Sequence, residues 1–564
     1  MARQPKNKNG NGSSPTLNTP QAVNAAIWSV CDILRRSNCA GALQYVPELT
    51  WLLFLRILDE QEQHEAETAE IVGEDFQPSL NEPYRWRDWA APYDETGEHP
   101  PVTAIGSRRG WLRRDRQNQP PGSFFAFVNG QLLPHLRSLA RQPNATPRQK
   151  VISQILSSVE RARVDTERNF ADVLDKLDPI RLETTDPQHV FILSQVYEGL
   201  LLRMGEKGND GGQFFTPRQV IKAMVEVIQP RLGETVYDPS CGTGGFLAQA
   251  YQYLHQREVK DNPAITPDQI DRLKHATFFG REKENLIYPI ALANLMVHGI
   301  DRPNLWHGNT LTGDAAYDRL FDTAPAQFDV ILTNPPFGGK EGTDAQKLFD
   351  FKTSATQMLF LQHILSHLKD GGRCGIVLDE GVLFRTNETA FVQIKRKLLD
   401  DCDLWCIVSL PGGVFTAAGA GVKTNLLFFT KGQPTTRIWY YDLSALKVAK
   451  RQPLIFEEHF KDFIECLPER RISDRSWSVD FAARQRHAAE TAAPFKVQAQ
   501  QKTDEANIWK ARLNDLKRQS PRDPAAETEA HWRLRRSRLR PVRDWRCWDG
   551  RWAGQRRNLR QCWR

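Results

Sequence analysis

The sequence predicts an α/β protein with a central sheet of parallel strands. Two short apolar runs rich in β-branched residues, 234–237 and 328–333, are typical of buried strands in such a sheet. The first run leads into a glycine-rich turn, and the second leads into two consecutive prolines. Both turns are expected at the carboxyl edge of the sheet, where open α/β sheets bind their ligands.

The chain begins with a polar segment that we expect to be disordered. Residues 1–20 are rich in Asn, Pro, Ser and Lys and lack the apolar stretch that a signal peptide needs. From residue 21 to about residue 70 apolar residues recur with helical spacing, and a second helix is predicted to begin at Pro47.

Residues 73–122 interrupt this helical pattern. They are rich in Pro, Trp and Arg with weak periodicity, and they predict a long loop or a capping segment. Helical spacing returns over 124–139 and over 151–177. We therefore expect a helical domain over residues 21–180. Interaction with a partner is its simplest role, because it contains no catalytic cluster.

A helix over 187–204, a flexible polar loop and a capped helix precede the first strand. The capped helix is predicted to open at Pro217 with Thr216 as its N-cap. A helix N-terminus can hold a carboxylate, because its unpaired N–H groups and its dipole favour negative charge. A capped helix with two core phenylalanines is an equally good interpretation. The candidate ligand-binding residues here are Gln213, Phe214, Phe215, Thr216, Pro217 and Arg218.

The glycine-rich turn begins at Asp238, directly after the first strand. Gly242, Gly244 and Gly245 would let the backbone around Thr243 approach a ligand closely. The turn lacks the third glycine of the nicotinamide fingerprint GxGxxG, so the glycines alone do not specify a cofactor. The order of strand, Asp-Pro, turn and helix favours a cofactor-binding turn.

The next two predicted strands each end in a polar residue. The run 276–282 ends in Glu282, whose carboxylate is suited to bind the two hydroxyls of a ribose; a solvated charge at a strand end is the alternative. A helix over 285–296 follows. The run 305–309 ends in Asn309, which is placed to reach the edge of an adenine ring, with a surface turn as the alternative.

Asn334-Pro335-Pro336-Phe337 is the most informative motif of the chain. The two prolines fix the backbone, remove two N–H donors and leave carbonyl groups facing a pocket. The amide oxygen of Asn334 and the carbonyl oxygen of Pro335 can both accept hydrogen bonds from one –NH₂ group. The ring of Phe337 offers a stacking face for a planar base. A proline-rich turn is the alternative, but the place after a buried strand favours a site.

The α/β domain is expected to span residues 181–475. A helix is predicted over 356–368, and the glycine-rich link 411–421 is suited to a loop at the rim of the site. Further strands are predicted over 375–378, 405–410 and 426–430.

The C-terminal part differs in composition from the rest. Residues 476–520 are expected to form a charged helical arm, and residues 521–564 an Arg- and Trp-rich tail that we expect to be disordered. A nucleic-acid-binding tail, or a stretch read in a different frame, are the alternatives. Residues 531–564 hold 12 Arg and 2 Asp, a charge of +10, which leaves about −3 of the net +7 for the body. Such a body is a poor DNA binder by itself, because neutralised phosphates supply most non-specific affinity.

Composition argues against two other classes. No run of about 18 apolar residues is present, so no membrane span is expected. The nine cysteines are scattered, without a CxxC pair or a histidine spacing suited to zinc. Reduced thiols in a cytoplasmic protein without a metal site are the expectation.

The motifs together resemble those of N6-adenine DNA methyltransferases. At residues 213–218, 238–246, Glu282 and 334–337, the chain is most similar to the modification (M) subunit of type I restriction–modification enzymes. The order of the motifs also matches that subunit, and the likeness covers roughly residues 20–515. It implies a Rossmann-like S-adenosylmethionine-dependent methyltransferase core with a helical N-terminal domain and a helical C-terminal arm.

The resemblance also implies roles for the site residues. S-adenosyl-L-methionine would be the cofactor, with 213–218 and 243–245 at its methionine part and Glu282 at its ribose. The target adenine would be flipped out of the duplex and stacked on Phe337, with its N6 amino group held by Asn334 and the Pro335 carbonyl. The methyl group would pass directly to nitrogen. The absence of any Pro-Cys dipeptide counts against C5-cytosine methylation.

The implied partners are double-stranded DNA, a specificity (S) subunit, a restriction (R) subunit and a second copy of the chain, with no membrane. We see no large domain after the catalytic region that would read base sequence, which favours delegated recognition. Two alternatives stay open: an amino or amide methyltransferase acting on RNA or protein, and a non-catalytic scaffold of a DNA-processing complex.

Overall fold

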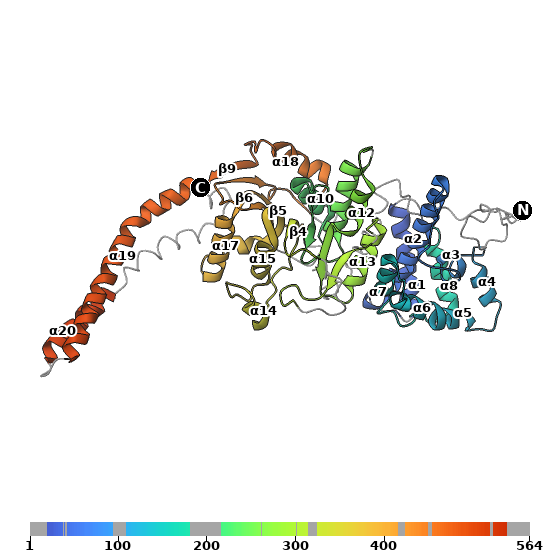
Figure 1. Ribbon diagram of the computed structural model, residues 1–564, viewed down its shortest axis with the longest axis horizontal. Helices are drawn as coiled ribbons and strands as arrows, with labels where there is room; N and C mark the ends of the chain where they lie inside the picture. Colours follow the sequence, from blue (N-terminus) through green and yellow to red (C-terminus); the bar gives the residue numbers. More distant parts are fainter. Residues whose placement is uncertain are drawn as a thin grey trace, which may run out of the picture. The chain divides into compact units, whose positions relative to one another are not determined.

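The structure is a computed structural model that describes most of the chain (Figure 1). The described residues are 20–37, 39, 42–93, 109–180, 216–260, 262–300, 302–313, 324–415, 423–448, 454–518 and 523–538. The chain divides into two compact units, residues 1–479 and residues 480–564. None of the described helices combines the length and the apolar character that a bilayer-spanning helix needs.

The first part of the chain is helical where it is described, as predicted. Its helices are α1 (Pro20–Arg36), α2 (Ala42–Val72), α3 (Trp86–Trp89), α4 (Trp111–Gln117), α5 (Ser123–Phe127), η1 (Val128–Leu132), α6 (Leu133–Ser138), η2 (Leu139–Arg141), α7 (Pro147–Ile155) and α8 (Glu167–Leu177). The predicted start at Pro47 is wrong, because α2 begins at Ala42 and contains the proline. A proline there costs one backbone hydrogen bond, which burial of the apolar side chains that follow, Leu49 among them, outweighs.

The predicted loop 73–122 is partly wrong, because it contains α3 and α4. Helices of four and seven residues are too short to produce a visible apolar period. Trp86 and Trp89 of α3 are fully buried, and their rings meet edge to face with centroids 5.6 Å apart. Part of this segment therefore belongs to the core of the helical region.

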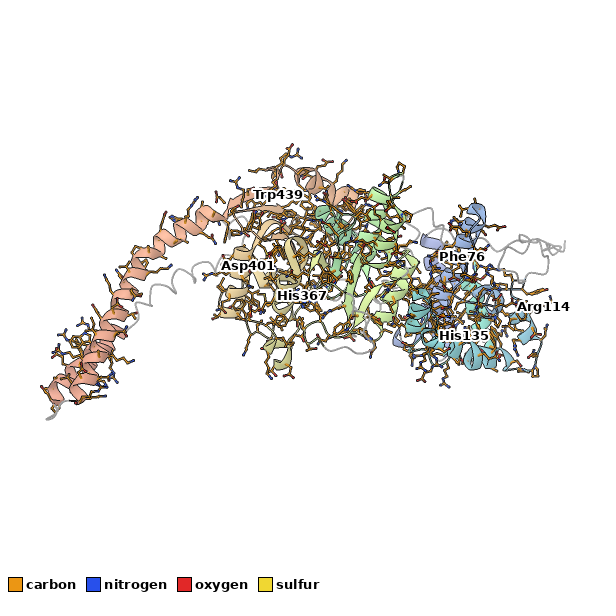
Figure 2. The ribbon with its side chains drawn as sticks, viewed as in Figure 1. Phe76, Arg114, His135, His367, Asp401 and Trp439 are labelled. Carbon is orange, nitrogen blue, oxygen red and sulfur yellow. The ribbon has the colours of Figure 1, made fainter. Side chains whose placement is uncertain are left out.

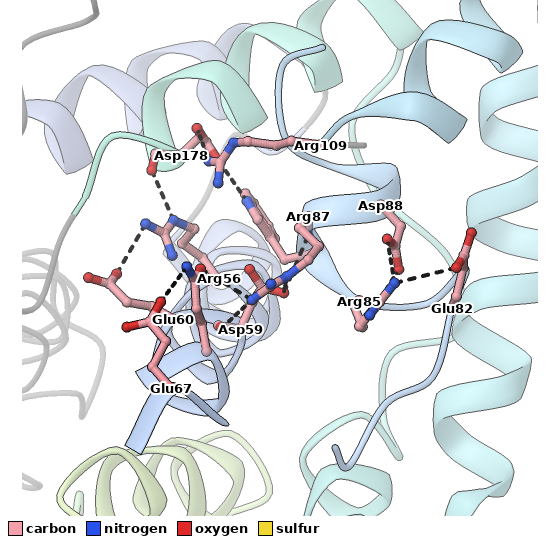
Figure 3. Close-up of polar contacts among 12 residues, drawn as sticks. Arg56, Asp59, Glu60, Glu67, Glu82, Arg85, Arg87, Asp88, Arg109 and Asp178 are labelled. Carbon is pink, nitrogen blue, oxygen red and sulfur yellow. Dashed lines mark hydrogen bonds and ion pairs between the residues drawn. The ribbon is translucent and has the colours of Figure 1, made fainter. Parts of the chain in front are cut away.

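A polar network joins the helical region around Asp178, at the end of α8 (Figure 3). The indole N–H of Trp86 and the guanidinium of Arg109 donate to its carboxylate, at 2.9 and 2.5 Å between heavy atoms. Arg56 of α2 donates to its backbone carbonyl at 2.9 Å. Burial raises the pKa of Asp178, but Arg109 and Arg56 outweigh it and hold the pKa below its usual range.

The described part of the first unit contains one sheet, with the strand order β3-β2-β1-β4-β5-β7-β6-β8-β9 (Figure 1). The strands are β1 (Val236–Asp238), β2 (Phe278–Glu282), β3 (Asn304–His307), β4 (Phe328–Thr333), β5 (Leu368–Asp379), β6 (Cys402–Ser409), β7 (Thr424–Lys431), β8 (Arg437–Asp442) and β9 (Ser476–Asp480). β1 is parallel to both β2 and β4, so that Tyr237 lies opposite Phe279 on one side and Ile331 on the other. The order therefore reverses between β1 and β4, which is where open α/β sheets bind ligands.

The predicted α/β class is confirmed. The strands β3-β2-β1-β4-β5 are parallel, as predicted, whereas the other end of the sheet contains an antiparallel strand. β4 matches the predicted run 328–333, and β5 extends the predicted strand 375–378 in both directions. β7 is antiparallel to β5 and β6. Apolar patterning could not show this, because a buried strand is apolar whichever way it runs. Trp439 of β8, labelled in Figure 2, is fully buried.

Two groups of helices flank the sheet. The helices are α10 (Arg218–Ile228), α11 (Gly245–Leu254), η4 (His255–Val259), α12 (Pro267–His275), α13 (Ile287–Val297), α14 (Thr343–Lys347), α15 (Thr356–His367), α16 (Glu380–Phe384), α17 (Thr389–Asp401), η5 (Phe456–Phe460) and α18 (Lys461–Cys466). α11 contacts α10 and α13, whereas α15 contacts α17. Right-handed crossovers place these two groups on opposite faces of the sheet. The predicted helix 187–204 lies outside the described residues.

The second unit is a pair of helices, α19 (Phe481–Arg518) and α20 (Pro524–Arg538), joined by a small cluster that includes Leu513, Ala530 and Leu534. The predicted helical arm 476–520 is wrong at its start, where residues 476–480 form β9. The predicted disordered tail 521–564 contains α20, and residues 539–564 lie outside the described residues.

Candidate active site

The glycine-rich turn leaves β1 and opens α11. Gly242 and Gly244 have φ angles of 52° and 79°, in the region that favours glycine. A Cβ on Gly245 would come within 2.9 Å of Cδ1 of Ile221, on α10. The glycine at position 245 therefore lets α10 lie directly against the turn.

Asp238 joins the ends of two neighbouring strands. Its side chain is buried, and Oδ1 accepts hydrogen bonds from the backbone N–H of Ser240 at 3.0 Å and from the hydroxyl of Thr333 at 2.7 Å. The hydroxyls of Ser240 and Thr333 are 2.9 Å apart. Because Asp238 ends β1 and Thr333 ends β4, this cluster connects the starts of the two loops that follow.

Glu282 is the last residue of β2, and its side chain forms a hydrogen bond with the same turn. Its two oxygens accept from the backbone N–H groups of Gly242, at 3.0 Å, and Glu284, at 2.8 Å. Burial raises the pKa of Asp238 and that of Glu282 to about 7 each. A carboxylate has about four lone-pair sites, more than the backbone N–H groups around it use, so a hydroxyl donor of a ligand can still bind Glu282.

Asn309 lies beyond the third strand rather than at its tip. β3 ends at His307, and the Asn309 side-chain oxygen accepts from the backbone N–H of Leu311 at 2.9 Å. This is a local turn of the kind that asparagine forms. Asn309 nevertheless borders the cavity described below, so its contact with a cofactor stays a prediction.

Asn334 is held by a threonine from another element. Its amide Nδ2 donates to Oγ1 of Thr216 at 3.0 Å. Its Oδ1 is buried and has no hydrogen-bond partner among the described residues. The predicted N-cap role of Thr216 is wrong, because α10 begins at Arg218, Pro217 occupies the cap position and no side chain caps it.

The rest of the Asn-Pro-Pro-Phe motif packs around Asn334. The Pro335 carbonyl lies 3.5 Å from Nε2 of Gln357, a long contact that leaves a second lone pair available. Phe337 is half-buried and meets Phe415 edge to face, with ring centroids 5.3 Å apart. Phe415 belongs to the link 411–421, of which residues 411–415 are described. The last described residue of that link, Phe415, therefore contacts the Asn-Pro-Pro-Phe motif.

The loops enclose a cavity of about 380 Å³, in the size range of sites for small ligands. The predicted site residues that line it are Thr216, Asp238, Gly242, Thr243, Gly245, Glu282, Asn309, Asn334 and Pro336. Others are neighbours of these in sequence and do not line it: Pro217, Arg218, Gly244, Pro335 and Phe337. Three lie outside the described residues: Gln213, Phe214 and Phe215.

The cavity offers acceptors and backbone donors rather than a nucleophile. Burial raises the pKa of the Cys241 thiol well above its usual range, so the thiolate is disfavoured. Within the ranges that the structure describes, no group of three or more His, Cys, Asp or Glu is arranged to hold a metal ion. A ligand with N–H or O–H groups fits these surroundings.

Sequence reasoning missed three residues that shape the site. Thr333 and Ser240 bind Asp238 or each other, and the Thr310 hydroxyl donates to the Pro239 carbonyl at 2.6 Å. Thr333 and Thr310 lie directly beside a predicted site residue and Ser240 lies two positions from one, and that proximity was the available signal. Thr333 pairs with Asp238 and Ser240, and Thr310 pairs with Pro239, across distances in sequence that no local pattern reveals.

Known proteins are similar to this chain over most of its length. The N-6 DNA methylase family matches residues 188–503, and the HsdM N-terminal domain family matches residues 23–104. The type I restriction enzyme EcoEI methylase subunit of Escherichia coli is 33% identical over 524 residues, which are 88% of this chain and 97% of that protein.

Two solved structures are similar as well. A modification subunit from Vibrio vulnificus YJ016 is 32% identical, with a TM-score of 0.67 over 84% of this chain and 94% of its own. A structure concerned with complex assembly and conformational transition of the type I R-M system is 36% identical, with a TM-score of 0.59 over 83% of this chain and 89% of its own. The chain therefore belongs to the N6-adenine DNA methyltransferases, as a modification (M) subunit of the type I restriction–modification family.

Proposed function

We propose that this chain transfers a methyl group from S-adenosyl-L-methionine to N6 of adenine in double-stranded DNA, with Asn334 as the residue that holds the acceptor. One observation carries the proposal. The buried Oδ1 of Asn334 has no hydrogen-bond partner among the described residues, and Asn334 lines the same cavity as the glycine-rich turn. A buried acceptor without a partner costs free energy, so it is expected to have a role with a ligand.

The residues around the cavity fit this cofactor. Thr243 and Gly245 of the turn, with Asp238 and Glu282, line a space that can take a nucleoside and a short charged chain. Glu282 would bind the ribose hydroxyls, and Asn309 would lie near the adenine. S-adenosyl-L-methionine would supply an electrophilic methyl group on a positively charged sulfur.

Asn334 and Pro335 would prepare the acceptor nitrogen. Their oxygens would accept the two N–H groups of N6, which draws the nitrogen lone pair out of conjugation with the ring. The lone pair can then form the N–C bond as the S–C bond breaks, and one N6 proton leaves afterwards. The adenine must first leave the base stack, and Phe337 would stack on the flipped base.

Sequence recognition would be delegated to an S subunit. The body outside residues 531–564 carries a charge of about −3, and phosphate contacts by basic side chains supply most DNA affinity. A complex of two copies of this chain with one S subunit would methylate DNA, and an R subunit would add cleavage.

The test separates cofactor binding from methyl transfer. Asn334→Ala should keep photo-crosslinking of labelled S-adenosyl-L-methionine and lose N6-methyladenine formation in the complex with its S subunit. Asn387→Ala, at an exposed position, is the matched control and should retain both. Methyl transfer by Asn334→Ala at the wild-type rate would refute the assignment. Methylation of RNA or protein, rather than DNA, would refute the substrate.

A further inference from the structure

We infer that Thr216 is a positioning residue for methyl transfer: its hydroxyl accepts a hydrogen bond from the NH₂ end of the Asn334 amide while the amide oxygen faces the adenine. The inference rests on the proposed function and goes beyond it, because it gives Thr216 a task on the acceptor side. The family resemblance placed this threonine with the cofactor. The structure instead shows its hydroxyl bonded to Asn334 Nδ2 at 3.0 Å.

The direction of this amide decides whether Asn334 can bind an amino group. The two ends of an asparagine amide have nearly the same shape, but one end accepts a hydrogen bond and the other donates. If the amide were reversed, its NH₂ group would face the NH₂ group of adenine, and two donors would oppose each other. With the oxygen toward the cavity, the NH₂ end needs an acceptor behind it.

Thr216 supplies that acceptor. Its Oγ1 has two lone pairs and can accept from Nδ2 while its own proton points elsewhere. When Oδ1 takes an N–H of adenine, both ends of the amide are satisfied. In the reversed orientation, Oδ1 could accept from the threonine, but the NH₂ end would meet another donor. The hydroxyl can pair with either end of the amide, and it satisfies the NH₂ end in the orientation that adenine requires. Without the hydroxyl, that NH₂ donor is left unpaired when adenine binds.

The position of Thr216 depends on the glycine-rich turn. Thr216 lies two residues ahead of α10, whose Ile221 packs against Gly245 of that turn. The threonine also lines the cavity. The element that orients the acceptor amide thus rests on the loop assigned to the cofactor.

The experiment compares Thr216→Val with Thr216→Ser in the full chain assembled with its S subunit. Valine keeps the size and removes the acceptor, whereas serine keeps the hydroxyl. We expect Thr216→Val to lower kcat by about tenfold or more, since an unmet buried donor costs enough to change a rate constant by that factor. Its KM for S-adenosyl-L-methionine and its cofactor crosslinking should stay within about threefold of wild type, and Thr216→Ser should restore kcat.

Three outcomes would overturn the inference. An unchanged kcat in Thr216→Val would remove the positioning role. A raised KM for the cofactor with an unchanged kcat would assign Thr216 to cofactor binding. A loss of kcat that Thr216→Ser shares would show that the hydroxyl is not the cause. If Thr216→Val melts at a lower temperature than wild type, Thr216→Ala is measured instead, against the same criteria. Absence of N6-methyladenine with the wild-type complex would instead refute the proposed function itself.

Discussion

The carboxyl group of Asp238 makes the stability of the fold depend on pH. Burial raises its pKa to about 7 from an ordinary value of 3.8. The folded state therefore binds this proton more tightly than the unfolded state does. The free energy of unfolding should fall as pH rises from about 4 to about 7 and should stay low above that.

Asp238→Asn should remove this contribution. Oδ1 accepts both recorded hydrogen bonds of the side chain, so an amide can keep them while the buried charge disappears. Without cofactor, the stability of the variant relative to wild type should be higher at pH 8 than at pH 5 by on the order of 2 kcal/mol, because the buried side chain is charged at pH 8 and mostly protonated in the folded state at pH 5. Thermal melts at the two pH values measure the difference, and cofactor crosslinking should fall.

Asp329 is a control because its pKa is shifted in the opposite direction from that of Asp238. Burial raises its pKa, but hydrogen bonds from Lys369 and Thr235 outweigh burial and lower it. Its stabilising contribution is therefore present at neutral pH and is lost in acid. Asp329→Asn should lose stability at pH 8. An equal gain for Asp238→Asn at pH 5 and pH 8 would contradict the role of its charge.

Two buried threonines test the link between β1 and β4. Thr333→Val removes the hydroxyl that binds both Asp238 and Ser240, so we expect a loss of about 1 to 2 kcal/mol in the free energy of unfolding. Thr424, on β7, is equally buried, and its hydroxyl has no partner among the described residues. Thr424→Val should be neutral or stabilising. Urea unfolding measures both, and equal losses would argue against the link.

At the scale of elements, the turn between β1 and α11 depends on its glycines. Gly244→Ala forces φ of 79° on an alanine and brings its Cβ to 3.2 Å from Leu295. Strain alone should cost about 1 kcal/mol. Gly371→Ala, with φ of 80° and no neighbour within 4 Å, is the matched control. Both variants should lose similar stability, but only Gly244→Ala should lose cofactor crosslinking. If Gly371→Ala also lost cofactor crosslinking, the loss in Gly244→Ala would reflect lower stability of the fold and not a local role of the turn.

The sequence predicted the cofactor side of the sheet well, because its signals are local. The run 328–333 and the Asp-Pro turn at Asp238 each combine apolar patterning with backbone chemistry that only a strand end explains. The direction of β7, the short helices of 73–122 and the bond between Thr216 and Asn334 were not predictable. The direction of β7 and the bond between Thr216 and Asn334 depend on partners distant in sequence. The helices α3 and α4 are too short to produce an apolar period.

At the scale of the whole molecule, the charge distribution predicts dependence on a partner. The isolated chain should methylate DNA at least about tenfold more slowly than the chain with its S subunit, because a body with a net charge of about −3 attracts phosphates weakly. Sequencing that detects N6-methyladenine measures the rate and the site. The complex carrying Asn334→Ala is the background control. Strong sequence-specific activity of the isolated chain would overturn delegated recognition.

The pairing of β1 with β4, rather than their separation in sequence, sets the distance between the glycine-rich turn and the Asn-Pro-Pro-Phe loop. Asp238 and Asn334 are 96 positions apart in the sequence, yet β1 and β4 are adjacent strands, about 4.8 Å apart. The segment around α12, between them, can therefore change length without moving either loop. A chain with a flexible insertion between residues 262 and 266 should therefore still bring both loops together.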